Sequence, residues 1–295
     1  MNSLKKLKLR FSRTERGVKR SYAVDIVMYG LLLLFGIVMV IPFVFAVSNA
    51  LKPLSEFFYF PPRIRVENPT MDNFKDLFRL MSDSWVPFSR YIFNTVLITV
   101  AGTAGHILLS SLCAYALAKH DFPGKNWIFG LIVVSLMFRG EVTTIPSFMI
   151  FSGLGLVDSY SSYILPALAS TLGLYLMKQF MEQMVPTEIL ESARMDGAGE
   201  FYVFWKMAMP MVKPAWLTLM MLSVQSLWNL GSTSYIRSEE LKTLNYALQQ
   251  ILTGGIARSG TAAAAMVLMM VVPIIIFIFS QSNIVETMST SGMKE

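Results

Sequence analysis

The chain has 295 residues, of which 54% are hydrophobic and only 15% are charged, and its mean hydropathy is +0.52. A soluble domain carries about 25% charged residues, so this composition excludes an ordinary soluble fold and indicates that lipid surrounds much of the chain. The single cysteine, Cys113, excludes an internal disulfide and a cysteine metal cluster. With only two histidines besides, the sequence predicts no catalytic metal site.

The net charge of +6 is unevenly distributed, because eight of the 25 Lys and Arg residues fall between Lys5 and Arg20. This cluster directly precedes the first apolar run. Such a position is typical of a cytoplasmic orientation signal that also contacts anionic lipid headgroups. We therefore expect membrane lipid, and no nucleic acid, as the partner of the basic residues.

Long stretches almost free of charge predict an all-α integral membrane protein with six transmembrane helices. A span needs about 20 apolar residues, and each run is long enough for one. The third run is interrupted by Arg139 and Glu141 and can include a break in its helix. The runs are Ile26–Leu51, Tyr91–Ala118, Asn126–Val157, Ser159–Met177, Pro214–Ile236 and Ser259–Val285.

The basic residues of the loops predict the orientation. With the N-terminus inside, the cytoplasmic segments collect 15 Lys and Arg and the outer segments 9, which places both termini in the cytoplasm. The predicted organisation is a basic N-terminal segment (1–23), a first transmembrane helix (24–50), an extracytoplasmic loop (51–90), a core with five transmembrane helices (91–285) containing a cytoplasmic loop (183–213), and a cytoplasmic tail (286–295).

The cytoplasmic loop 183–213 predicts two short helices joined by a glycine turn. Thr187 is a candidate N-cap of the first helix, and Gly197 suits the left-handed position that ends it. The second helix is expected over Glu200–Met207, ending before Pro210. Its apolar face has helical spacing and must be covered by the chain's own helices or by a partner; it comprises Phe201, Phe204, Trp205 and Ala208.

This loop resembles the EAA loop of binding-protein-dependent ABC importer permeases, whose pattern is Glu-Ala-Ala-x3-Gly-x9-Ile-x-Leu-Pro. Here Glu191-Ser192-Ala193-x3-Gly197 is followed after nine residues by Met207-x-Met209-Pro210. The exchanges at Ser192, Met207 and Met209 are small or apolar and keep the helices. Further likeness to the sugar subfamily, of the maltose type, extends from about Tyr91 to the C-terminus.

The resemblance implies a type I ABC importer permease in a bacterial inner membrane, importing a sugar or oligosaccharide. Its implied partners are a second permease, two cytoplasmic ABC ATPases and an extracytoplasmic sugar-binding protein. The loop would be the coupling helix docked on an ATPase, with Glu191 making the ionic contact; otherwise Glu191 is merely a helix-dipole acid. The implied coupling residues are Glu191, Ser192, Ala193, Asp196, Gly197, Met207 and Pro210.

The chain has no P-loop, since Gly124-Lys125-Asn126 lacks both the upstream glycine and the Ser or Thr. We therefore expect no cofactor in this chain, with ATP and Mg²⁺ held by the partner ATPase.

Candidate residues of the translocation path are Arg139, Glu141, Gln225, Trp228 and Asn229. Arg139 and Glu141 would point about 200° apart on a straight helix, so they can pair with each other only if the backbone breaks, and Gly140 lies between them. One hypothesis is an unwound, water-facing stretch that lines the transport path. The alternatives are an interfacial ion pair with a neighbouring helix, or an outer half of the span that extends into water. The later polar and aromatic residues are equally typical of the interfacial belt of a membrane protein.

An ion-coupled secondary transporter is the alternative function. It needs ionisable residues within the spans, and Arg139, Glu141 and Asp25 are the candidates. A membrane-embedded enzyme ranks third, since no Gly-x-Ser-x-Gly elbow appears.

Overall fold

The computed structural model describes residues 22–59, 61, 63–82, 85–138, 140–231, 233–253, 255 and 258–291. These residues form helices, turns and loops and contain no strand, which confirms the predicted all-α fold. The chain divides into two compact units, Met1–Phe45 and Ala46–Glu295. The first unit contains most of α1 (Tyr22–Leu51), an apolar helix with Pro42 inside it.

Three helices of the described chain are long and apolar enough to cross a membrane: α1, α3 (Phe88–Lys119) and α13 (Ser259–Ser291). They coincide with the first, second and sixth predicted spans. A fourth candidate is a bent pair, in which Glu200–Met211 and Lys213–Trp228 meet at 80°. The total of six spans stays a prediction, as does the placement of the termini.

The third and fourth predicted spans are each divided. The predicted break in the third span is confirmed, because α4 (Lys125–Ser135) ends before α5 (Gly140–Gly153) begins. The prediction of the fourth span as one helix is wrong, because Ala169 and Ser170 separate α6 (Ser161–Leu168) from α7 (Thr171–Met184). Ser170 has an extended backbone at the start of α7, a position where serine is favoured.

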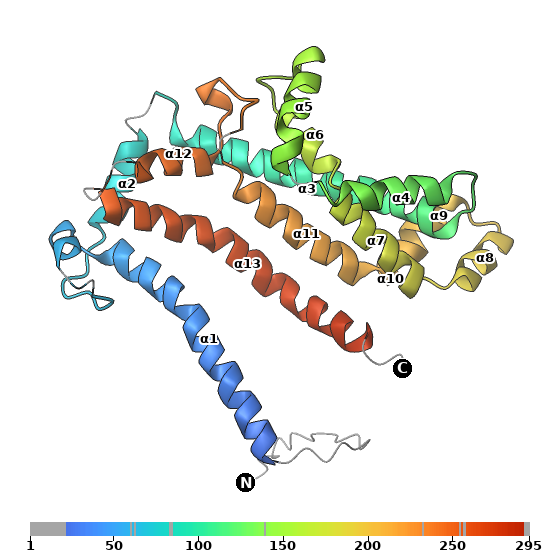
Figure 1. Ribbon diagram of the computed structural model, residues 1–295, viewed down its shortest axis with the longest axis horizontal. Helices are drawn as coiled ribbons and strands as arrows, with labels where there is room; N and C mark the ends of the chain where they lie inside the picture. Colours follow the sequence, from blue (N-terminus) through green and yellow to red (C-terminus); the bar gives the residue numbers. More distant parts are fainter. Residues whose placement is uncertain are drawn as a thin grey trace, which may run out of the picture. The chain divides into compact units, whose positions relative to one another are not determined.

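The second unit is built around α3, which packs along α6, α7 and α11 (Lys213–Trp228), while α11 also contacts α13 (Figure 1). Glycines let these helices approach closely. A Cβ at Gly102 would lie 2.7 Å from Leu227 Cδ1 of α11, and one at Gly105 would overlap Leu168 of α6. Without side chains at these positions the helices pack backbone against side chain, as membrane helices commonly do.

The first turns of α3 hold the segment that precedes α12 (Leu244–Leu252) and the residue that precedes α6. The amide of Asn94, fully buried, donates to the carbonyls of Glu240 (2.8 Å) and Lys242 (2.9 Å) and accepts from the Tyr160 hydroxyl (2.8 Å). Glu240 belongs to the short helix η3 (Glu239–Leu241). α12 and α2 (Asp72–Ser82) thus lie at one end of α3, and α8 (Thr187–Met195) and α9 (Glu200–Val203) lie at the other (Figure 1).

Asp158 joins the loop between α5 and α6 to the segment between α11 and η3. Its φ of 63° is in the left-handed region, which aspartate tolerates better than most residues. Its carboxylate accepts hydrogen bonds from the backbone N–H groups of Arg237 (3.0 Å) and Ser238 (2.9 Å) and from the Ser238 hydroxyl. These bonds, foremost that of the Ser238 side chain, lower the pKa of Asp158 below its ordinary value of 3.8.

We expect Asp158→Ala to lower the free energy of unfolding by about 1–3 kcal/mol, because charge-assisted bonds are lost and alanine is strained at this φ. The stability that the ionised Asp158 carboxylate contributes is fully present above pH 3.8, and it disappears as the pH falls through the lowered pKa of the folded state. Thermal unfolding of the detergent-solubilised protein, measured at neutral pH and below pH 3, tests this. A difference between the proteins that stays constant over this range would contradict it.

Candidate functional site

The loop at 183–213 forms a helical hairpin, as predicted. α8 ends at a turn in which Gly197 has a φ of 83°, and the N–H of Ala198 bonds to the Ala193 carbonyl (3.0 Å). The predicted left-handed glycine is confirmed. The predicted N-cap is wrong: Pro186 occupies that position and Thr187 is already helical, because the fixed φ of proline suits the entry to a helix.

The second half of the hairpin does not stop before Pro210 as expected. α9 continues into a π-helical turn, η2 (Phe204–Ala208), and then into α10 (Met209–Met211), and the chain bends only at Val212. In the π turn the N–H of Met209 bonds to the Phe204 carbonyl. Pro210, the next residue, has no N–H to continue the α-helical pattern, which accounts for the wider turn at this position.

One face of the hairpin is buried against the chain itself. Leu190, Ala193, Val203, Phe204 and Ala208 pack in one cluster with residues of α3 and α7, and Met207 contacts the same cluster. The predicted aromatic face is therefore divided. Phe204 and Ala208 are covered by the chain's own helices, whereas Phe201 is 76% exposed and Trp205 is 50% exposed.

A polar anchor, comprising Tyr115, His120, Arg194 and Glu200, ties the hairpin to the end of α3. Arg194 binds Glu200 through two nitrogens (2.7 and 3.3 Å), and the Tyr115 hydroxyl donates to the same carboxylate (3.2 Å). His120 Nε2 lies 3.5 Å from it. The hydrogen bond from Arg194 lowers the pKa of Glu200, so this carboxylate is ionised at neutral pH and holds both halves of the hairpin to α3.

The other face of the hairpin is open. Glu191, Ser192, Asp196 and Pro210 are exposed, and Met195 is 88% exposed. The Ser192 hydroxyl is used locally, donating to the Glu188 carbonyl (2.9 Å). Among the described residues, the Glu191 carboxylate has no hydrogen-bond or salt-bridge partner. A free carboxylate between large exposed apolar side chains can therefore bind a cationic group of another protein.

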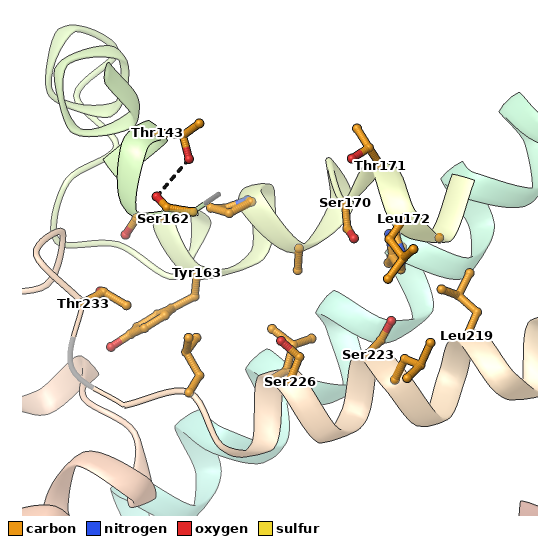
Figure 2. Close-up of a pocket in the computed structure, with 18 of the residues that line it drawn as sticks. Thr143, Ser162, Tyr163, Ser170, Thr171, Leu172, Leu219, Ser223, Ser226 and Thr233 are labelled. Carbon is orange, nitrogen blue, oxygen red and sulfur yellow. Dashed lines mark hydrogen bonds between the residues drawn. The ribbon is translucent and has the colours of Figure 1, made fainter. Parts of the chain in front are cut away.

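A cavity of about 680 Å³ lies in the middle of the second unit. Its walls come from α3, α5, α6, α7, α11 and the segment after α11 (Figure 2). Ser170 and Thr171 on one wall lie opposite Ser223 and Ser226 on α11, and Tyr163 points toward Thr233. Hydroxyl groups and leucines make up most of the lining, which includes Thr143, Ser162, Tyr163, Ser170, Thr171, Leu172, Leu219, Leu222, Ser223, Ser226, Leu227, Leu230, Thr233 and Tyr235.

Gly173 and His106 also line this cavity. The His106 ring is 2% exposed, and its Nδ1 lies 3.3 Å from the Ser110 hydroxyl. A Cβ at Gly173 would overlap His106 Nε2 and lie 2.6 Å from Leu219 Cδ1. The absence of a side chain at Gly173 therefore lets α3, α7 and α11 meet here.

Gly173→Ala is expected to lower the free energy of unfolding by about 1–3 kcal/mol, because the added methyl group forces a buried imidazole and a leucine apart. Gly130→Ala is the matched control, since Gly130 is also inside a helix, α4, and a Cβ there meets nothing within 4 Å. Thermal unfolding midpoints of both variants check the prediction. Equal midpoints for the two variants would show that the close approach at Gly173 does not contribute to stability.

Of the predicted path residues, those whose side chains the structure describes, Gln225, Trp228 and Asn229, do not line this cavity. Arg139 lies outside the described residues, as does the Glu141 side chain, although the neighbouring Gly140 lines the cavity. Gln225 and Asn229 are exposed and bonded to each other, from Asn229 Nδ2 to the Gln225 carbonyl (2.8 Å). Their role in a path stays a prediction.

Trp228 is buried between helices. Its indole N–H donates to the Met269 carbonyl of α13 (3.0 Å). In a regular helix that carbonyl would accept from residue 273, which is Pro273 and has no N–H. The tryptophan thus satisfies a carbonyl that the proline leaves free, and this gives Trp228 a structural role that the sequence did not suggest.

Sequence reasoning missed the cavity serines. Ser223 and Ser226 are three residues apart on the fifth apolar run, so they share one face of a helix. This spacing was the available signal, but small hydroxyl residues at helical spacing also occur wherever membrane helices pack closely.

Comparison with known proteins places the chain among transport proteins. Residues 106–290 match the family described as binding-protein-dependent transport system inner membrane component. The arabinooligosaccharides transport system permease protein AraQ of Bacillus subtilis is 31% identical, over 83% of this chain and 87% of the relative. The polygalacturonan/rhamnogalacturonan transport system permease protein YtcP of the same organism is 29% identical, over 77% of this chain and 78% of the relative.

A solved structure has the same fold. It is a chain of a bacterial ABC transporter involved in the import of the acidic polysaccharide alginate, with a TM-score of 0.76. The alignment covers 91% of this chain and 99% of that chain at 22% sequence identity.

Proposed function

Because this chain belongs to the family of binding-protein-dependent transport system inner membrane components, we propose that it is one of two permease subunits that form the translocation path of an ATP-driven importer. The chain is a transporter subunit rather than an enzyme. The proposed cargo is a sugar or oligosaccharide, since two of the relatives are named for arabinooligosaccharides and for polygalacturonan and rhamnogalacturonan.

The observation that supports ATP coupling best is the geometry of the hairpin. It offers an exposed face with an unpaired carboxylate at Glu191 and large apolar side chains at Met195 and Phe201. Apolar anchors beside a free charge are typical of a docking surface. We propose that this face docks on a cytoplasmic ATPase, with the contact made by Glu191, Asp196 and their exposed neighbours.

The buried face of the hairpin supports the transmission of force. Ala193 and Met207, two residues of the EAA pattern, pack on the chain's own helices. In the polar anchor, Tyr115 near the end of α3 donates a hydrogen bond to the Glu200 carboxylate, which also binds Arg194 of the other half of the hairpin. A hairpin fixed in this way moves with α3 as a body, so displacement of the docked face would be passed to the helices that line the cavity.

The remaining partners follow from this role. We propose a second permease beside the exposed apolar helices, two ABC ATPases on the cytoplasmic side, where ATP and Mg²⁺ are bound, and an extracytoplasmic sugar-binding protein. The proposed location is a bacterial inner membrane, with both termini and the hairpin in the cytoplasm.

Co-purification tests the proposal. When an affinity-tagged chain is expressed with the neighbouring genes of its operon, a second permease and an ATPase should co-purify with it in detergent. The same preparation should hydrolyse ATP. Recovery of the chain alone, in a folded state and active in transport without an ATPase, would overturn the proposal in favour of a secondary transporter.

A further inference from the structure

The cavity between α7 and α11 holds hydroxyl groups without a partner. Within the described part of the chain, the side chains of Ser170, Thr171, Ser223 and Ser226 form no hydrogen bond. By contrast, the hydroxyls of Thr143, Ser162 and Tyr235 donate to carbonyls of the chain. Ser170 and Thr171 face Ser223 and Ser226 across the cavity (Figure 2). Free hydroxyls that converge from two walls both donate and accept, as a polyhydroxylated ligand requires.

The described lining residues include no Asp, Glu, Lys or Arg. The one imidazole, His106, is almost fully buried beside Ser110. Leucines supply the apolar surface between the hydroxyls. The described lining therefore offers hydrogen bonds and apolar contact, and none of its side chains carries a charge that would compensate a carboxylate.

We propose that this cavity binds an uncharged portion of a sugar and disfavours a uronate. The inference rests on the proposed function and extends it to the substrate class. Its volume of about 680 Å³ falls within the range of small-molecule sites, about 300–1,000 Å³. The serine and threonine hydroxyls bond to sugar hydroxyls, while Leu172 and Leu222 contact the C–H faces of the ring.

The absence of charged side chains from the described lining decides between the two sugar classes. A carboxylate entering the cavity loses its water and meets no described cation, which is strongly unfavourable. A neutral sugar exchanges its water for the free hydroxyls. The cargo bound here thus has the chemistry of a neutral oligosaccharide rather than that of a polygalacturonan fragment.

Cysteine labelling of the assembled importer in proteoliposomes measures the charge preference directly. In a Cys113→Ser background, which removes the single native cysteine, Ser226→Cys places a thiol in the cavity. It is treated with neutral hydroxyethyl and anionic sulfonatoethyl methanethiosulfonate. Gln250→Cys is the control, since Gln250 is exposed on α12 and outside the cavity.

We expect the neutral reagent to label Ser226→Cys at least about tenfold faster than the anionic reagent, after division by the same ratio at Gln250→Cys, because the anion must shed its water without gaining a partner. Arabinotriose should slow the labelling of Ser226→Cys, and trigalacturonate at the same concentration should not. Neither sugar should change the labelling of Gln250→Cys.

Equal normalised rates for the two reagents, or equal protection by trigalacturonate, would overturn the inference. It would also be overturned if Ser226→Cys is not labelled while Gln250→Cys reacts, since lipid or the partner permease would then fill the cavity. Anionic labelling that is fast but is slowed by Arg139→Gln would also overturn it, by revealing a cation at the cavity. Failure of the proposed function would be recognised separately, as absence of ATP-driven uptake in the Cys113→Ser background.

Discussion

Glu191→Lys is expected to reduce ATP-driven uptake at least about tenfold and to weaken ATPase association, because a docked cation would face a like charge at this position. The fold of the permease should be unaffected, since Glu191 is exposed and has no hydrogen-bond or salt-bridge partner among the described residues. Uptake into proteoliposomes and the yield of co-purified ATPase are measured on the same preparation, together with the thermal unfolding midpoint of the permease.

Glu188→Lys is the matched control for this variant. Glu188 lies one turn earlier on the same helix, is also exposed, and undergoes the same change of charge. We expect it to retain most of the uptake, with a small loss of helix stability because an acid is removed from the first turn. Equal loss of uptake in the two variants would show that the effect comes from the change in net charge and that Glu191 has no specific role in docking.

The second large effect is expected at Trp228. Trp228→Phe should lower the free energy of unfolding by about 1–3 kcal/mol, because the Met269 carbonyl loses the indole donor in an apolar environment. Pro273→Ala restores a backbone N–H four residues beyond Met269, so the same tryptophan change should cost about 1 kcal/mol less in that background. Unfolding of the four proteins, measured under one set of conditions, gives the coupling.

The double-mutant cycle separates the hydrogen bond from packing. The loss of ring volume is the same in both backgrounds and cancels, provided that α13 keeps its path. Additive costs, with no coupling between positions 228 and 273, would show that the indole does not compensate for the proline.

The sequence was sufficient for the long helices and for the hairpin turn. α1, α3 and α13 could be predicted because an uninterrupted apolar run of that length has few other solutions. Gly197 could be predicted because a left-handed residue after a helix strongly favours glycine. The EAA pattern drew attention to the right loop, since its spacing is specific.

Features that depend on tertiary packing could not be predicted from the sequence. Ala169 and Ser170 interrupt α6 and α7 within an apolar run, where composition gives no sign of a break. Phe201 and Phe204 are similar residues three positions apart, but only the fold, which packs Phe204 against Tyr115 of α3, decides which of them is buried.

Contacts between residues far apart in the sequence could not be predicted either. The partner of Trp228 lies 41 residues away in the sequence, and its meaning depends on a proline further on. Ser170 and Ser223 are ordinary residues of apolar segments until the fold brings them to opposite walls of one cavity.

ATP-driven uptake by the reconstituted complex tests the central claim most directly. Proteoliposomes containing the chain with its second permease and ATPase, and the sugar-binding protein outside, receive ATP inside and a labelled oligosaccharide outside. We predict uptake that requires internal ATP, persists in the presence of an uncoupler and is lost when the hairpin residues 187–209 are replaced by a flexible linker. Uptake that continues without ATP and collapses with the uncoupler would contradict the account.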